Sequence, residues 1–460
     1  MEYGSTRGGS AGHGFAATLL SGLAPDGGLY VPARIDPLDA AALDRLRGAD
    51  YATLARDLIA RFAGTDVDRG DVADAVARAL GQFRHPAIAP HRQLAEDRWL
   101  LELFHGPTLA FKDYALQFVG ELVEHQLQRA GRRATVLCAT SGDTGAAAAA
   151  AFARRANVSV VVLHPAGRVS EVQRRQMTTL TADNVFNFAV DGDFDDCQAL
   201  VKALFLDPAA APLHLAAVNS INWARIVCQV AYYAWSSVRL AASGPVNYVV
   251  PTGNFGNVLA ADVARRLGFP VGRLVLSSND NDVLPRFFET GRMERRETRR
   301  TLSPSMDIQV SSNFERALWF ACDGDGRQVE RYQRELAEAG GYSVDPGVLH
   351  RLRERFEAVR CSEDEALAEM ARAWRESGVM LCPHTATAAH AARRLDLQGP
   401  TVVAGTAHPA KFPEAVARAT GLEPPRPEVL ASVMEAPERY RQCPADAAAL
   451  RDRLLSEIAG

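Results

Sequence analysis

Short valine-rich runs alternate with helix-like stretches along most of this chain, and this alternation constrains the fold more than any other feature. Near-continuous apolar runs are typical of parallel strands buried on both faces, and apolar residues three and four apart are typical of amphipathic helices. The expected strands are 135–139, 158–163, 185–190, 247–250, 274–277 and 401–404. The helices expected after them are 144–154, 170–180, 194–205, 258–267 and 413–419. The pattern predicts an α/β protein with parallel sheets.

The strand–helix units fall into two separated groups, which predicts two α/β domains. We expect the first at residues 91–245 and the second at 246–460, with an insertion at about 291–341, where charge is high and the alternation stops. Residues 1–90 show helical spacing instead, and Pro86 and Pro90 end that pattern. A helical N-terminal extension is therefore expected, with helices at 40–47, 51–62 and 72–80.

Composition and charge exclude several classes of protein. The 460 residues include 51 Lys and Arg against 55 Asp and Glu, so the basic footprint of a nucleic-acid binder is missing. No apolar run approaches the ~20 residues of a membrane span, and the start of the chain has no signal-peptide pattern. The seven cysteines are scattered, without the spacing of a zinc site or a disulfide framework. We expect a cytoplasmic protein that acts on a small molecule, with no metal, membrane or nucleic acid.

Three turns rich in glycine or hydroxyl residues each follow an expected strand, at residues 140–145, 252–257 and 405–409. Ligands of open α/β sheets bind at the carboxyl ends of the strands, where such turns gather. Because a helix start offers unpaired N–H groups to an anion, the turn at 252–257 is a candidate phosphate cradle. Any one turn could instead reflect a backbone requirement alone. The motifs of nucleoside triphosphate binding are missing.

Lys112 is the only lysine between residues 1 and 201, and it follows the apolar run Leu109-Ala110-Phe111. A lysine amine, unlike a guanidinium, loses its proton readily when it is desolvated and can form a Schiff base. The residues alone leave open a lysine at a helix start whose amine reaches solvent.

The motifs taken together resemble the threonine synthase family. The resemblance runs in order from about residue 15 to 420. It rests on the segments 103–114, 139–145, 251–257 and 406–412, with support from 15–32, 219–222 and 301–307. The resemblance implies a fold-type-II enzyme, of the tryptophan synthase β-like kind, with pyridoxal 5′-phosphate (PLP) between the two α/β domains.

The resemblance also implies roles for particular residues. Lys112 would be the catalytic residue and hold PLP as a Schiff base, Thr406 would face the pyridine nitrogen, and Asp143 would lie near the phenolic oxygen. The cofactor phosphate would lie on Gly253, Asn254, Phe255, Gly256 and Asn257. The substrate carboxylate would lie on Ser141, Gly142 and Thr144. Candidates for the rest of the substrate, each of which could equally be an ordinary surface or structural group, are Asn219, Ser220, Asn222, Arg225 and Lys411, with Arg168 and Arg174.

The implied reaction converts O-phospho-L-homoserine and water into L-threonine and phosphate, the last step of threonine biosynthesis, with Lys112 as the base at Cα and Cβ. One alternative is a PLP-dependent phospho-lyase, which would release 2-oxobutyrate, ammonia and phosphate. Another is a non-catalytic binding protein on the same scaffold. The sequence leaves open whether the chain is a monomer or a homodimer.

Overall fold

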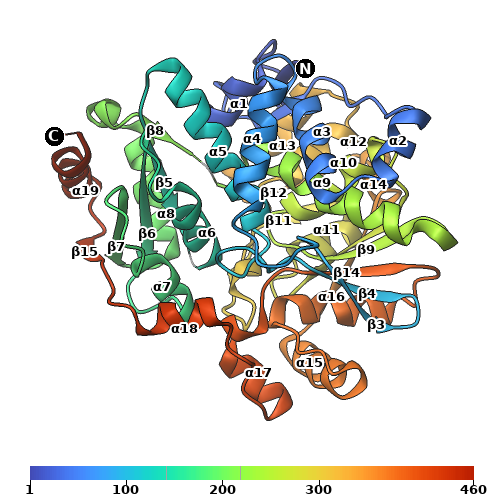
Figure 1. Ribbon diagram of the computed structural model, residues 1–460. Coiled ribbons are helices and arrows are strands. Elements are labelled where there is room, and N and C mark those ends of the chain that lie inside the picture. Colours follow the sequence, from blue (N-terminus) through green and yellow to red (C-terminus); the bar gives the residue numbers. More distant parts are fainter. Residues whose placement is uncertain (141, 218, 460) are drawn as a thin grey trace.

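The computed structural model describes residues 1–140, 142–217 and 219–459. Two sheets of mostly parallel strands lie side by side with helices on their faces, and a helical N-terminal region packs against them (Figure 1). This confirms the predicted α/β class. The six predicted strands lie within six strands of these sheets, and each helix predicted after a strand overlaps an observed helix.

The N-terminal region is helical, apart from one small antiparallel pair of strands. An aspartate caps each of its last three helices: Asp39, Asp50 and Asp68 accept hydrogen bonds from N–H groups of the first turn. The elements of this region are β1 (Tyr3–Ser5), α1 (Phe15–Ser21), β2 (Tyr30–Pro32), α2 (Ala40–Arg47), α3 (Tyr51–Ala63) and α4 (Arg69–Leu80).

The first large sheet has five parallel strands in the order β15-β7-β6-β5-β8. Along β6, Val160 and Val162 join the core under α6, whereas Val161 and Leu163 join the core under α8. Both faces are covered, so the run is apolar throughout instead of alternating. The strands are β5 (Ala134–Ala139), β6 (Val158–Pro165), β7 (Val185–Asp191), β8 (Leu215–Ala216) and β15 (Arg441–Pro444), and the helices among them are α5 (Asp113–Ala130), α6 (Asp143–Phe152), α7 (Glu171–Thr178) and α8 (Phe194–Leu206).

The second large sheet has six strands in the order β13-β10-β9-β14-β4-β3, all parallel except the β3–β4 pair. Its faces are covered by α10 on one side and α16 on the other. The strands are β3 (His91–Ala95), β4 (Arg98–Glu102), β9 (Val246–Pro251), β10 (Val271–Ser278), β13 (Phe356–Arg360) and β14 (Thr401–Gly405), and the two helices are α10 (Gly256–Arg266) and α16 (Pro383–Arg394).

The remaining helices lie around these sheets, and α9 (Trp223–Leu240) packs against both α5 and α10. Within residues 291–341, where the alternation was expected to stop, no strand belongs to either large sheet. The other elements are η1 (Pro208–Leu213), η2 (Ala241–Ser243), α11 (Val283–Thr290), β11 (Arg292–Glu294), η3 (Pro304–Met306), α12 (Phe314–Ala321), α13 (Gly326–Ala339), β12 (Gly341–Ser343), α14 (Pro346–Arg353), α15 (Glu363–Ser377), η4 (Pro409–Lys411), α17 (Pro413–Thr420), α18 (Glu428–Glu435), α19 (Ala447–Leu454) and η5 (Leu455–Ala459).

The two large sheets exchange strands across the predicted domain boundaries. β3 and β4, expected in the first domain, pair with the second sheet, because β4 lies beside β14 in parallel register. β15, near the end of the chain, pairs with β7 of the first sheet. The largest hydrophobic core also runs without a break through both halves. The division at residues 90 and 245 itself stays a prediction.

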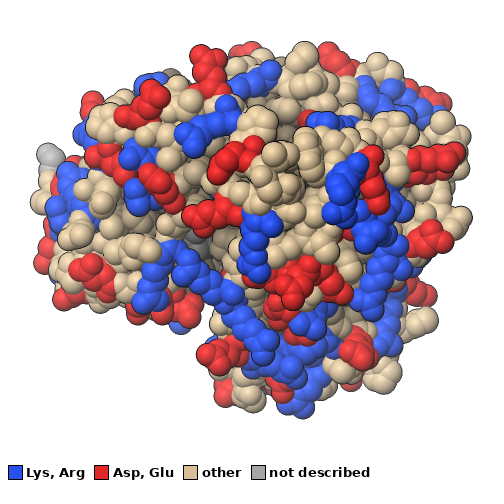
Figure 2. Space-filling model, turned by 90° about the horizontal axis from the view of Figure 1, so that it is seen from below, with Lys and Arg blue, Asp and Glu red and all other residues tan. Residues whose placement is uncertain are grey.

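Acidic and basic side chains share the face seen from below, and basic side chains predominate over its lower right part (Figure 2). The presence of both signs fits the nearly balanced composition, with a formal net charge of −4. Among the described residues, no helix is both long enough and apolar enough to cross a membrane. All seven cysteines are buried, as expected of small hydrophobic side chains.

Candidate active site

Lys112 lies at the start of α5, directly beside the end of β14. The backbone N–H of Phe111 donates to the carbonyl of Thr406 at 2.9 Å, and that of His408 donates to the carbonyl of Leu109 at 3.0 Å. The loop that carries Lys112 therefore forms an isolated antiparallel bridge, Ala110 with Ala407, to the segment that follows β14. This pairing brings Lys112 next to Thr406, although the two are distant in the sequence.

The Lys112 side chain points into the protein, and the residue is only 8% exposed. Its Nζ lies 3.8 Å from Oδ2 of Asp143. Burial lowers the pKa of Lys112 from its usual 10.5 to about 8, against the opposing effect of Asp143 and with the help of Lys411 and Arg225. The alternative of an amine that reaches solvent from a helix start is therefore wrong. An amine with this pKa can gain and lose a proton near neutral pH.

Asp143, in the first turn of α6, accepts hydrogen bonds from two buried side chains. Its Oδ1 lies 2.8 Å from Nζ of Lys411 and 2.9 Å from Nε2 of Gln173. Burial alone would raise the pKa of this carboxyl, but the charges of Lys411 and Lys112 outweigh it and hold the pKa well below its usual range. Asp143 is therefore a fixed negative charge beside the Lys112 amine.

Lys411 is fully buried and also contacts the Lys112 loop, because its Nζ donates to the carbonyl of Thr108 at 2.7 Å. Asp113 fixes that loop in turn by accepting hydrogen bonds from the N–H and the hydroxyl of Thr108, both at 2.8 Å. The structure thus places Lys411 on Asp143 and Thr108. Its predicted contact with substrate stays a prediction.

Hydrogen bonds from neighbouring residues hold the turn between β9 and α10 in place. The carbonyl of Gly253 accepts a hydrogen bond from Ser311, and the carbonyl of Asn254 accepts two from Asn313. Gly253 is required here, since a Cβ would lie 2.9 Å from the carbonyl oxygen of Ser305. Phe255 has a left-handed backbone, with φ of 64°, and its buried ring packs between two other phenylalanines.

The start of α10 suits an anion. The carbonyl oxygen of the Asn257 side chain accepts hydrogen bonds from the hydroxyls of Tyr232 and Tyr233, at 2.6 and 2.7 Å. The Nδ2 of Asn257 is buried and has no hydrogen-bond partner in the described part of the chain. A buried donor without a partner, beside the positive end of a helix dipole, fits a phosphate group.

The other two turns lie at the start of α6 and at the end of β14. Thr140 ties the first together, because its hydroxyl oxygen accepts from the N–H groups of Gly142 and Gly145 at 2.9 and 3.0 Å. Thr144 is half-buried in the first turn of α6, and Ser141 lies outside the described residues. Thr406 is buried, and its N–H donates to the hydroxyl of Thr385 at 3.2 Å.

Contacts between side chains link the three turns. The ion pair between Asp143 and Lys411 joins the turn after β5 to the segment after β14. Ser305, which lies against Gly253, donates its N–H to Nε2 of His384 at 3.2 Å. The charges of Asp143, Lys112 and Lys411 act on the His384 imidazole. His384 therefore links the turn before α10, through Ser305, to the Asp143 cluster.

The remaining predicted substrate residues separate into two groups. Arg225 is buried in α9, and its charge acts on Lys112; the Ser220 hydroxyl lies 3.4 Å from that of Ser312, which bonds to Asn254. The other four are engaged elsewhere or exposed. Asn222 caps α9 and donates to the carbonyl of Leu19, and Arg174 makes two hydrogen bonds to Glu438. Asn219 and Arg168 are exposed.

His384 and Gln173 are site residues that the sequence did not single out. Burial lowers the pKa of His384 to about 4, so the ring is neutral at neutral pH. Because its Nε2 accepts from Ser305, the ring proton is on Nδ1, a buried atom without a hydrogen-bond partner among the described residues. The polar pair His384-Thr385 in a stretch rich in apolar residues is the signal that could have found it.

Matches to family models assign the chain to a known class of enzymes. Residues 83–405 match the model described as pyridoxal-phosphate dependent enzyme, so the chain is a PLP-dependent enzyme of fold type II. Residues 2–80 match the threonine synthase N terminus, and residues 385–453 match the threonine synthase C-terminal model. The chain belongs to the threonine synthase family.

Individual relatives match the chain over nearly its full length. The chain is 44% identical over 449 residues to the threonine synthase of Pseudomonas aeruginosa, covering 96% of each chain, and 39% identical over 477 residues to that of Corynebacterium glutamicum, covering 100% and 99%. Its structure matches PLP-bound threonine synthase from Brucella melitensis with a TM-score of 0.97 at 42% identity, covering 100% of both chains. The yeast threonine synthase structure matches with a TM-score of 0.94 at 36% identity, covering 100% and 99%.

Proposed function

We propose that this chain converts O-phospho-L-homoserine and water into L-threonine and phosphate. The observation that carries the proposal is the buried amine of Lys112, with a pKa of about 8, held 3.8 Å from the permanently charged carboxylate of Asp143. A reaction that removes protons from carbon at neutral pH needs a base of this kind. Family membership supports the choice of substrate.

The site residues fit PLP as the resident cofactor. Lys112 would be its covalent anchor, the turn Gly253–Asn257 would bind its phosphate, and Thr406 would face its pyridine nitrogen. Among the described residues, the buried Nδ2 of Asn257 has no hydrogen-bond partner and no side chain caps α10, and both observations support the phosphate assignment. Asp143 would lie near its phenolic oxygen. When bound, PLP supplies an electron sink for the negative charge that develops at the substrate Cα.

Lys112 is the group that moves protons. Its Nζ would remove the proton from Cα and, after giving that proton up, remove one from Cβ; phosphate would then leave from Cγ and the Cβ proton would return at Cγ. The hydroxyl part of water would add at Cβ, its proton would go to the released phosphate, and a proton would return to Cα. Two neighbouring groups are unsuited to this task at neutral pH. The pKa of His384, at about 4, and the still lower pKa of Asp143 keep the ring neutral and the carboxylate charged.

The substrate lies against the start of α6 and against α9. Gly142 and Thr144, together with Ser141, bind the substrate carboxylate at the positive end of α6. Arg225, with Ser220 and Asn219 near it in the sequence, binds the substrate phosphate. Asn222, which caps α9, and Lys411, the partner of Asp143, stay candidates for contact with the substrate.

The proposal extends to the context of the enzyme. It acts in the cytoplasm on a small molecule without nucleic acid, as a monomer or a homodimer. Its two α/β domains are residues 91–245 and 246–460, with the helical extension at 1–90 and an insertion at about 291–341. The nearly balanced charge supports the absence of a nucleic-acid partner.

Product analysis tests the reaction against its alternative. The purified holoenzyme is supplied with O-phospho-L-homoserine, and L-threonine, 2-oxobutyrate, ammonia and phosphate are measured over time. We expect threonine and phosphate in equal amounts. Phosphate with 2-oxobutyrate and ammonia, and without threonine, would establish the phospho-lyase instead. No phosphate release from a protein that carries its cofactor would favour a non-catalytic binding protein.

A further inference from the structure

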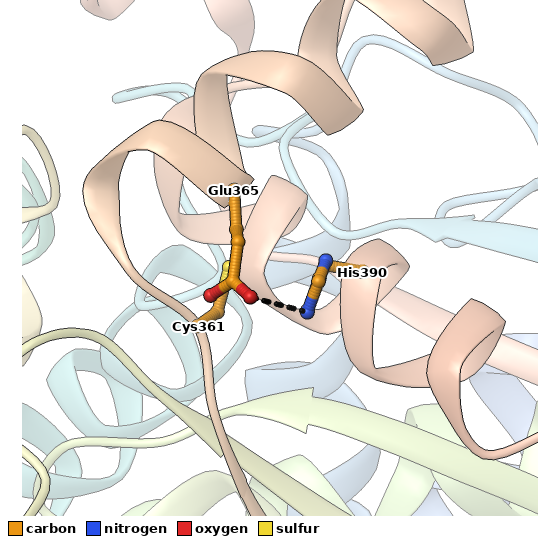
Figure 3. A group of neighbouring side chains, drawn as sticks. All are labelled: Cys361, Glu365 and His390. Carbon is orange, nitrogen blue, oxygen red and sulfur yellow. Dashed lines mark ion pairs between the residues drawn. The ribbon is translucent and has the colours of Figure 1, made fainter.

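Three side chains capable of binding a metal, one buried, one half-buried and one exposed, lie close together where α15 and α16 pack. Cys361 follows β13, Glu365 lies in the first turn of α15, and His390 lies on α16. Their ligand atoms all lie within 4.8 Å of one another. Figure 3 shows the Glu365 carboxylate directed toward the His390 ring, with Cys361 beside it.

We propose that Cys361, Glu365 and His390 bind a divalent transition-metal ion, with zinc the best match. Thiolate, imidazole and carboxylate are the three side-chain ligands that zinc takes in proteins. Three protein ligands leave a fourth tetrahedral position for water.

The distances between the ligand atoms are close to those around zinc. His390 Nε2 lies 3.7 Å from Glu365 Oε1. Two ligands of one tetrahedral zinc lie about 3.3–3.6 Å apart, given bond lengths of about 2.0–2.3 Å. The other separations are at most 4.8 Å, so small rotations of Cys361 and His390 would bring all three ligand atoms within reach of one ion.

The ligand atoms of Glu365 and His390 are left available by their neighbours. The second carboxylate oxygen of Glu365 accepts from the N–H of Ser362 at 2.7 Å, in a capping box that fixes the side chain and leaves Oε1 toward His390. The Nε2 of His390 is buried without a hydrogen-bond partner in the part of the chain that the structure describes. The 3.7 Å contact with Glu365 is too long to be that hydrogen bond.

Charges of both signs surround this place. The carboxylates of Glu365, Glu369 and Asp280 act on the Cys361 thiol, and the guanidinium of Arg360 acts on it in the opposite sense. Arg360 pairs with Asp280 and Arg393 with Glu369, whereas Arg394 lines the same cavity and acts on Glu365. Metal binding replaces the S–H bond of Cys361 with a metal–sulfur bond and releases the proton to solvent.

A path from solvent exists on the side of Glu365. A surface cavity of about 260 Å³ is lined by Glu365, Glu369 and His390, among others. The metal would join the start of α15 to α16, the helix whose first turn carries His384 and Thr385 beside the active site. The proposal does not depend on the reaction proposed above.

Cobalt(II) and zinc(II) are the probes for this site. The holoenzyme, freed of metal by chelation, is titrated with Co²⁺, and thiolate-to-cobalt charge-transfer absorbance is recorded. We expect one Co²⁺ per chain and loss of the band when Zn²⁺ is added, because zinc binds such sites more tightly. A rise in the melting temperature with added Zn²⁺ should accompany binding.

Variants assign the ligands. Cys361→Ser should abolish the charge-transfer band. Glu365→Gln keeps the capping box and should weaken Co²⁺ binding at least tenfold, as should His390→Gln. The matched control is His350→Gln. It removes an exposed histidine that pairs with Glu354 and that belongs to no metal-ligating group found among the described residues. If Cys361→Ser fails to fold, the Glu365 and His390 variants decide. No stoichiometric band in the wild type, or binding equal to wild type in Glu365→Gln and His390→Gln, would overturn the proposal.

Discussion

Two buried aspartates, Asp143 and Asp262, are each surrounded by cationic side chains, but their clusters are built from different residues. Asp143 is held by Lys411 and faces Lys112, whereas Asp262 is held by Arg265, Arg266 and Arg355. In both carboxyls the positive neighbours outweigh burial and lower the pKa. A lowered carboxyl pKa therefore does not by itself locate the active site.

The Asp262 cluster is a structural network of ion pairs. Asp262 is only 1% exposed, and it binds two arginines of its own helix, α10, together with Arg355, which precedes β13. Guanidinium groups stay charged at all relevant pH values and bind carboxylates with fixed geometry. These arginine side chains also reach solvent, at 22–32% exposure. The cluster links α10 to an edge of the second sheet without moving protons.

The Asp143 cluster uses amines, and both lysines are buried. Burial makes the charged form of an amine costly, so Lys112 has a pKa of about 8 and can exchange its proton. The difference between the two regions teaches that the type of cation, and its burial, separates a proton-transfer site from a structural ion pair.

The largest effect is expected from Lys112→Ala. Removing the base alone should lower the rate of threonine formation by about 10²–10⁴-fold, and the covalent link to the cofactor is lost as well. Initial rates, and the protein mass after borohydride reduction with PLP, measure the two losses. The exposed Lys202→Ala is the control and should keep both properties. A Lys112→Ala protein with rates within tenfold of wild type would contradict the assignment.

Neighbouring charges should move the pKa of Lys112 in opposite directions. Asp143 raises this pKa and Lys411 lowers it. Only the neutral amine reacts with an aldehyde, so the rate at which PLP-free protein recovers covalent cofactor should rise with pH, with a midpoint near pH 8. Asp143→Asn should shift the midpoint down by about one unit, and Lys411→Met should shift it up. Shifts in the same direction would show that the two charges do not act through Lys112.

The smallest effect on catalysis is expected from Asp262→Asn. Unpairing the three arginines should lower the free energy of unfolding by about 2 kcal/mol, while the rate per folded molecule stays unchanged. Because the folded-state pKa of Asp262 is lowered from 3.8, its contribution is complete above that pH and is lost as the pH falls below it. The stability difference between wild type and variant should therefore narrow below about pH 4.

Denaturant unfolding at several pH values measures this difference. Arg355→Lys, at a partly exposed position, is the milder companion and should cost less than about 1 kcal/mol. A loss of turnover in Asp262→Asn without a loss of stability would place this cluster in the catalytic machinery after all.

Local sequence patterns predicted a large part of the secondary structure. The six strands predicted from valine-rich runs are present, because buried parallel strands are apolar along their whole length. β13 was missed, since this short strand at the edge of its sheet alternates with charged residues and has no continuous apolar run. β15, near the end of the chain, has only one buried residue, Cys443, and was missed for the same reason.

By itself, the sequence determined the α/β class, the turns after β5, β9 and β14, and the singular position of Lys112, because each depends on residues close together along the chain. Only the tertiary structure decided that β4 lies beside β14, and hence that Lys112 lies beside Thr406. It also decided that Lys411 pairs with Asp143 and that His384 faces the same cluster. These contacts join segments far apart in the sequence, and burial, which sets the pKa of Lys112, exists only once those segments have packed.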